Sequence, residues 1–399
     1  MTDMQRKSTI RLRIGILSLA TLTLSGIFIT PIIAQIAQAF PHESASTVQL
    51  LISINTLMNL VGAWIVTSLR KITSLKNISL MAVTGIGIFG LLPVFFHHSL
   101  WMLIVFSGSM GIFLGFLATV LPTIISENFN NQERQGIMGQ QVAFSSIGAM
   151  IFIIAIGKLG TINWHIAYTA YAAAFIILAI VAFMLPSDKV HASDETKTDL
   201  HLHMRDVLSG KSITLLVCGF IFVAMMTSYN TNISLIISES QLGNSHFAGL
   251  ITMLNQIGGL LAGLLVGVLV RVIKTRMYSI AFLCEGIGFL LIALYPTTWT
   301  LAAGSFIAGM GCSFYYAQAP FLMSVIQKPW LIPAGIAVLT TANGLGGFAS
   351  PFIINGINAL MFNASAHGAL LVSGSALIIG AIALFITNFQ AHCMSSQEK

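Results

Sequence analysis

Long apolar segments recur along this chain and are separated by short polar stretches. Twelve of them are long enough to cross about 30 Å of hydrocarbon as helices. They cover residues 14–39, 47–69, 78–97, 100–125, 137–157, 164–185, 212–238, 247–270, 277–296, 299–326, 332–360 and 365–389. The pattern predicts an all-α integral membrane protein with twelve transmembrane helices.

The charges between these segments predict the orientation of the chain. With the N-terminus inside, all 18 Lys and Arg residues except Lys158 fall on the inner face. Short basic loops resist translocation, so this bias predicts that both termini are cytoplasmic. We expect a multi-pass protein of the plasma membrane.

Composition agrees with a membrane protein, because 56% of residues are hydrophobic and 8% are charged. A soluble domain has roughly one quarter charged residues. The net charge of +6 comes from basic residues that are spread along the predicted inner face without a dense patch, so nucleic acid is not an expected partner. Residues 1–39 also resemble a signal peptide, but their apolar stretch is longer than the usual 7 to 15 residues of such a signal.

One polar interruption divides six predicted helices from six. Residues 186–211 are predicted to form a cytoplasmic linker between an N-terminal half, residues 1–185, and a C-terminal half, residues 212–399. A shift of 198 residues places Gly111 on Gly309 and Gly148 on Gly346. Transporters built from duplicated halves show such repetition.

Several local patterns carry a family resemblance. Pro31 followed by Phe40, Gly111-x-x-x-Gly115 with Pro122, and the loop 126–136 resemble the ends and loops of helices 1, 4 and 5 of the major facilitator superfamily. The resemblance implies twelve helices in two pseudo-symmetric six-helix halves. Independently of the resemblance, prolines deep in the spans, Pro31 among them, predict that their helices bend.

The loop after the second helix departs from the pattern of this family. The family has an Asp-Arg pair and a Gly-Arg pair there, whereas this chain has Arg70 in place of the Asp and Thr73-Ser74 in place of Gly-Arg. Glu127 is a possible partner for Arg70 or Lys71. The candidates for a cytoplasmic gate are Arg70, Lys71, Glu127 and Arg134; the alternative is ordinary solvated loop charges.

Neutral polar residues in the spans are candidates for substrate binding, because the resemblance implies that their helices line a central cavity. An interhelical hydrogen bond is the alternative role for each one. The candidates are Asn55, Asn59, Gln141, Tyr229, Asn232, Asn255, Gln256, Tyr315, Tyr316, Gln318 and Asn343.

Glu285 is the one well-placed ionisable residue deep within a span. An ionisable residue at that depth is a functional candidate by default. It is our candidate for proton coupling, with a structural role as the alternative.

These features favour a secondary active transporter with alternating access, and we expect proton-coupled export of small neutral or amphipathic compounds. An importer or facilitator of one neutral solute is the alternative, and a receptor on a transporter scaffold is the alternative outside transport. The spans carry no convergent catalytic constellation and no phosphate-binding loop, so we expect no enzyme, cofactor or metal. The expected partners are a small-molecule substrate, the bilayer and protons, and we expect a monomer.

Overall fold

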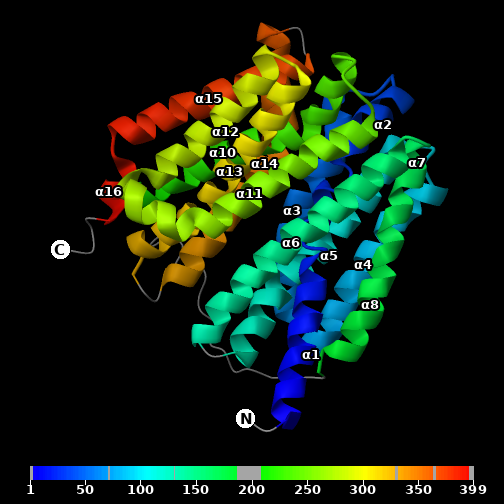
Figure 1. Cartoon of the computed structure of the whole chain (residues 1–399), viewed down its shortest axis with the longest axis vertical. Coiled ribbons are helices and arrows are strands. Elements are labelled where there is room, and N and C mark those ends of the chain that lie inside the picture. The colour runs from blue at the N-terminus through cyan, green and yellow to red at the C-terminus, as the bar shows by residue number, and fades with distance from the viewer. Residues whose placement is uncertain are drawn as a thin grey trace. The chain divides into compact units, whose positions relative to one another are not determined.

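A computed structural model describes residues 3–70, 72–129, 131–186, 208–328, 331–362 and 365–394 (Figure 1). Lys71 and most of the predicted linker, residues 187–207, lie outside the described residues, so the boundaries of the linker stay a prediction. Helices and turns make up the described part, which contains no strand. The fold is all-α, as the sequence predicted.

Contacts divide the chain into two compact units. The first unit comprises Met1–Asp194 with Ser245–Leu250, and the second comprises Glu195–Asn244 with Ile251–Lys399. The helices before the predicted linker are α1 Asp3–Ala20, η1 Ser25–Ile27, η2 Thr30–Ile32, α2 Ile33–Ala39, α3 Ala45–Leu69, α4 Leu75–Phe95, α5 Leu100–Asn128, α6 Asn131–Gly160, α7 Trp164–Ala167, η3 Tyr168–Ala172 and α8 Ala173–Met184. Those after it are α10 Gly210–Glu239, α11 Ser245–Ile273, η4 Lys274–Arg276, α12 Met277–Leu294, α13 Thr298–Ile326, α14 Ile332–Met361, α15 Ala366–Ile386 and α16 Phe389–Met394.

Eleven of the described helical segments are long and apolar enough to cross a membrane. The remaining predicted span, 299–326, forms α13, a helix of 29 residues. It carries Tyr315, Tyr316 and Gln318 among small residues. A helix of that length is sufficient to span the bilayer.

The first predicted span is not one continuous helix. It contains α1, the two 3-10 turns η1 and η2, and α2, and Pro31 lies within η2. The expectation that Pro31 lies deep in an α-helix was therefore wrong. Proline lacks a backbone N–H and clashes with the preceding turn, so the helix is interrupted around it. Pro93, Pro122, Pro320 and Pro351 do lie inside α-helices.

Glycines allow close packing of equivalent helix pairs in the two units. A Cβ at Gly111 of α5 would lie 2.9 Å from Asn55 Cα of α3, and a Cβ at Gly309 of α13 would overlap the carbonyl oxygen of Asn255 of α11. Likewise Gly148 packs on the backbone of Thr21 and Gly346 on that of Phe220. The offset of 198 found in the sequence thus corresponds to the same kind of backbone contact in each unit.

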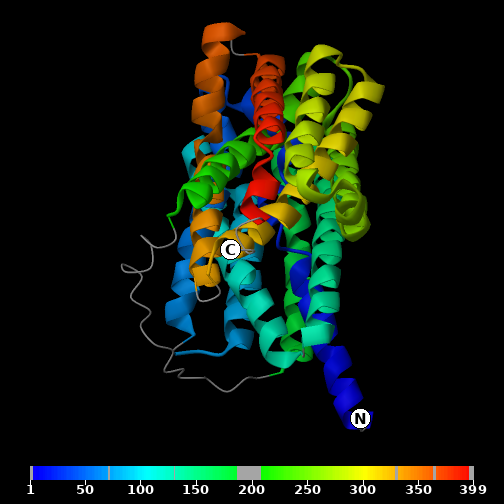
Figure 2. The ribbon, with the colours of Figure 1, turned by 90° about the vertical axis from the view of Figure 1, so that its left-hand side faces the viewer.

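Within the second unit, α12 packs against both α13 and α15, and α10 packs against α14 and α15 (Figures 1 and 2). Aromatic rings fill the space between α10, α12 and α13. Phe222 stacks on Tyr315 with ring centroids 4.0 Å apart, and Tyr229 stacks on Phe289 at 5.8 Å. This aromatic layer holds the helices that carry the polar groups of the candidate site against one another.

Candidate substrate and coupling site

Three helices of the second unit meet at a hydrogen bond between two predicted site residues. The Tyr315 hydroxyl of α13 donates to Asn343 Oδ1 of α14 over 2.7 Å. Gly219 of α10 provides the space, because a Cβ there would lie 2.6 Å from Asn343 Oδ1 and 2.8 Å from the Tyr315 hydroxyl. Tyr315 is fully buried, whereas Asn343 is partly exposed. Tyr315 therefore orients a partly exposed amide.

A second polar junction joins α10, α11 and α13 through Ser305. The Tyr229 hydroxyl donates to Ser305 Oγ over 2.8 Å, and Asn255 Nδ2 donates to the Ser305 carbonyl oxygen over 3.0 Å. Tyr229 is 2% exposed, so its hydroxyl forms this hydrogen bond in the interior of the unit. Asn255 is partly exposed. The sequence did not single out Ser305, because a serine in a small-residue run looks like a packing residue.

The remaining candidates of this unit differ in exposure. Gln318 of α13 is buried and accepts a hydrogen bond from Gln390 Nε2 of α16 over 3.2 Å. Tyr316 is 47% exposed, and Gln256 is partly exposed. Asn232 is buried and donates to the Ser228 carbonyl oxygen of its own helix over 2.9 Å. Helical spacing placed Asn232 and Tyr229 together, but their polar groups have different partners.

Glu285 lies in the middle of α12 and is 2% exposed. Its Oε2 atom accepts no hydrogen bond from the described residues. Gly311 of α13 faces it closely, since a Cβ there would lie 2.6 Å from the Glu285 nitrogen and 2.9 Å from its Cβ. A buried carboxyl without an ion-pair partner is costly, and this cost is the physical reason to assign it a function.

The candidates of the first unit lie mainly at the contact between α3 and α5. Asn55 is buried, its Nδ2 donates to the Leu51 carbonyl oxygen over 2.9 Å, and its Oδ1 has no described partner. Asn59 is partly exposed, and its backbone oxygen lies against Gly115. Gln141 of α6 is also partly exposed. The structure brings Asn55 and Asn59 to one helix contact without a shared hydrogen bond.

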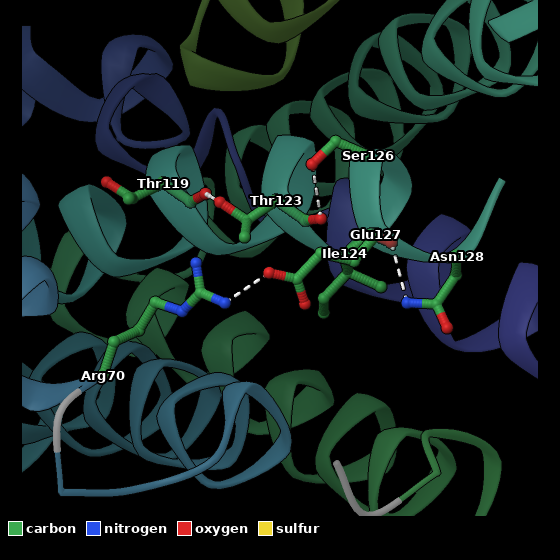
Figure 3. A network of polar contacts seen from close by, with 7 residues as sticks. All are labelled: Arg70, Thr119, Thr123, Ile124, Ser126, Glu127 and Asn128. Carbon is green, nitrogen blue, oxygen red and sulfur yellow. Dashed lines mark hydrogen bonds and ion pairs between the residues drawn. The ribbon is translucent and has the colours of Figure 1, made fainter. Parts of the chain in front are cut away.

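Two of the four gate candidates form an ion pair. Arg70 at the end of α3 donates through Nη2 to Glu127 Oε1 near the end of α5 (Figure 3). Their side chains are 34% and 41% exposed. Lys71 lies outside the described residues, and for Arg134 only the backbone, within α6, is described. The pairing exists, and its role as a gate stays a prediction.

Figure 3 also shows how the backbone of α5 is arranged beside this ion pair. Thr123 donates to the Thr119 carbonyl oxygen over 2.7 Å, Ser126 to that of Thr123 over 2.9 Å, and Asn128 Nδ2 to that of Ile124 over 2.9 Å. These side chains bond to their own helix. Glu127 of the same stretch reaches across to Arg70 at the end of α3.

Neutral donors and acceptors dominate the candidate site. In the described helices of the second unit, Lys and Arg occur only in the first turn of α10, the last turn of α11 and the short η4, as Lys211, Arg271, Lys274 and Arg276. A carboxylate or phosphate substrate usually requires a buried cation. Aromatic rings and amides instead suit a neutral solute with an apolar face and a few polar groups.

The long apolar helices define a multi-pass membrane protein with polar groups buried among its helices. The family model of the Major Facilitator Superfamily matches residues 14–229, which is more than half of the chain. The protein belongs to the Major Facilitator Superfamily. No curated protein matches the sequence.

Solved structures with the same fold include the nucleoside transporter NupG in two forms. A mutant form matches with a TM-score of 0.79 and 14% identity, covering 95% of this chain and 99% of the other. The second crystal structure of NupG matches with a TM-score of 0.76 and 14% identity, covering 95% and 98%. At this identity the similarity shows the fold.

Proposed function

We propose that this transporter is a proton-coupled exporter of small neutral or amphipathic compounds that works by alternating access. The observation that supports the substrate class is the hydrogen-bonded set Tyr315–Asn343 and Tyr229–Ser305–Asn255, whose groups are all uncharged. In alternating access the two halves rock about a central site and expose it to each side in turn.

Proton coupling in this proposal is assigned to Glu285. The carboxyl is buried and its Oε2 atom has no described partner, so no ion pair of that atom must break when a proton binds or leaves. Gly311 allows α12 and α13 to approach closely at the same position. A change in protonation there would act directly on the helix that carries Tyr315 and Gln318.

The remaining parts of the proposal concern orientation and gating. We place the protein in the plasma membrane as a monomer with both termini cytoplasmic, because the basic loops favour that topology. The Arg70–Glu127 pair then lies at the cytoplasmic end of the first half, where it can hold α3 to α5 in one state of the cycle.

A second candidate function is uptake or facilitated movement of one neutral solute. The structural similarity to a nucleoside transporter favours this alternative, because a nucleoside is neutral and combines an aromatic base with hydroxyl groups. The same aromatic and amide groups can bind either class of solute.

The experiment is solute movement in sealed proteoliposomes with an imposed pH gradient. Radiolabelled uridine represents nucleosides and radiolabelled chloramphenicol represents neutral amphipathic compounds. Export predicts chloramphenicol movement against its gradient, driven by protons moving the opposite way. Uridine movement with the proton gradient supports the second candidate. Failure of the reconstituted protein to move any neutral solute would contradict both.

A further inference from the structure

The C-terminal helix α16 is held against the second unit. Helix α15 ends at Ile386, and the chain turns at Asn388, which adopts the left-handed backbone conformation with a φ of 45°. Asparagine tolerates this conformation better than most residues and commonly follows the end of a helix. α16 then packs on α13, α15 and η4, and Figure 2 shows it in deep red directly below α15.

Gln390 of α16 joins two other helices through its side-chain amide. Its Oε1 accepts from the Tyr278 backbone nitrogen of α12 over 2.9 Å, and its Nε2 donates to Gln318 Oε1 of α13 over 3.2 Å. Tyr278 is in the first turn of α12, where backbone N–H groups have no intrahelical acceptor. Arg276, the residue preceding α12, supplies no side-chain cap. Gln390, 3% exposed, therefore caps α12 from a distance.

Other contacts fix α16 in the same position. The Phe389 ring lies 6.3 Å from that of Tyr278, which in turn lies 6.0 Å from the ring of Tyr315. Lys211 Nζ at the start of α10 donates to the His392 carbonyl oxygen over 2.6 Å. The short helix thus contacts the aromatic layer that carries the candidate site.

Gln318 connects this tail to the candidate site. It follows Tyr315 by three residues, so the two side chains share a face of α13. Tyr315 bonds to Asn343, and Gln318 is bonded by Gln390. An amide whose oxygen is already bonded is held in one orientation before a solute arrives, and this preorganisation reduces the ordering cost of binding.

We propose that Gln390 is a positioning residue that orients the Gln318 amide for solute binding, so that α16 sets the affinity of the substrate site. This inference rests on the proposed function, since it requires Gln318 to contact the solute. Without Gln390, the Gln318 oxygen lacks its buried donor and the amide can rotate. We expect the KM for transport to rise roughly fivefold, the cost of about one hydrogen bond, while Vmax changes little.

The test uses the full-length protein in proteoliposomes, with initial rates of uridine and chloramphenicol movement measured over a range of concentrations. Gln390→Met and Gln318→Met keep the side-chain length but remove the hydrogen bond from either side. Gln318→Met leaves the hydrogen bond that caps α12 in place. It therefore still removes the Gln318–Gln390 hydrogen bond in a folded protein if Gln390→Met folds poorly. Met394→Ala, on an exposed residue of the same helix, is the matched control.

We expect Gln390→Met to raise the KM roughly fivefold with Vmax within about twofold, Gln318→Met, which also loses the solute contact, to raise it at least as much, and the double variant to be no worse than Gln318→Met. A purely structural role lowers the amount of active protein and hence Vmax, but leaves the KM unchanged. Normal transport by the wild type with an unchanged KM in well-folded Gln390→Met would overturn the inference, whatever the KM of Gln318→Met, and would leave the proposed function intact. No transport by the wild type would overturn the proposed function itself.

Discussion

The two units share glycine contacts but differ in how polar side chains join their helices. In the first unit Asn55, beside Gly111, donates to its own helix at Leu51. In the second unit Asn255, beside Gly309, donates across to Ser305 of α13. The repeated backbone packing thus supports different polar chemistry. A duplicated framework can keep a helix contact while the side-chain hydrogen bonds beside it differ between the two copies.

The same contrast extends to neighbouring positions. A shift of 198 places Ser107 on Ser305, Pro31 on Tyr229 and Gly87 on Glu285. Among the described side chains of the first unit, no carboxyl is buried as Glu285 is, and the residue aligned with Tyr229 is a proline without a hydroxyl. Its described ion pair, Arg70–Glu127, lies at exposed helix ends. We conclude that the second unit carries most of the buried polar interactions assigned to the candidate site.

The largest expected effect comes from a substitution that breaks the glycine contact found in both units. Gly309→Ala places a Cβ against the Asn255 carbonyl oxygen, so α11 and α13 must separate. Overpacking of this kind costs about 1 to 3 kcal/mol. We expect a clear drop in the thermal unfolding midpoint of the purified protein, and a smaller drop for Gly111→Ala, where the nearest atom is 2.9 Å away.

Gly356→Ala is the control for these variants, because a Cβ there meets nothing within 4 Å. We expect it to be neutral or slightly stabilising, since alanine favours a helix over glycine. An equal loss in Gly309→Ala and Gly356→Ala would show that the helix contact is not the cause.

The next effect tests the polar link itself. Tyr229→Phe and Ser305→Ala each remove the hydrogen bond between α10 and α13, so their effects should not add. We expect a coupling energy of about 0.6 to 1.7 kcal/mol, the range of interhelical hydrogen bonds in membranes. A double-mutant cycle on thermal or denaturant unfolding measures it. Ser107→Ala, at the equivalent position of the first unit, should cost less; a larger cost there would reverse the comparison between the units.

A smaller effect is expected at the ion pair of the first unit. Because Arg70 and Glu127 are exposed at the ends of α3 and α5, Arg70→Gln should destabilise the protein by less than about 1 kcal/mol. High salt should remove the difference from wild type, since exposed charges are screened. Unfolding midpoints at low and high salt check this. A large, salt-independent loss would indicate that the pair is more than an exposed surface contact.

The last effect is confined to high pH and concerns Cys393 of α16, which is fully buried. Burial raises the pKa of this thiol to about 11, opposed by the nearby Lys211. Because the folded state holds the proton more tightly, the stability from the thiol is present below pH 9 and is lost as the pH rises toward 11. The stability difference between wild type and Cys393→Ala should therefore shrink above pH 9. A difference that grows with pH would contradict the buried position of α16.

Hydrophobic length was sufficient to predict most of the fold. Each predicted span corresponds to helical structure, because about 20 apolar residues leave few alternatives in a membrane. The break at Pro31 was missed, since a proline in a long apolar run can either bend or interrupt a helix. The final span was extended to residue 389 because Phe389 continues the apolar pattern, whereas the structure ends α15 at Ile386 and begins α16 at Phe389.

The candidate site was less predictable than the fold. Residue type identified Tyr315 and Asn343, but only tertiary packing shows that they bond to each other and that Gly219 makes room for them. Gln390 was missed because it follows the last span and has no periodic pattern around it. The Asn388-Phe389-Gln390 sequence, a helix-ending residue followed by an apolar one, was the available signal.

The most direct test of the account is proton movement in sealed proteoliposomes during solute transport, comparing wild type with Glu285→Gln. Glu43→Gln, a carboxyl in the loop before α3, is the matched control. The account predicts that solute-dependent proton movement is lost in Glu285→Gln and kept in Glu43→Gln. Solute movement without protons, unchanged by Glu285→Gln, would contradict proton coupling and leave Glu285 with a structural role.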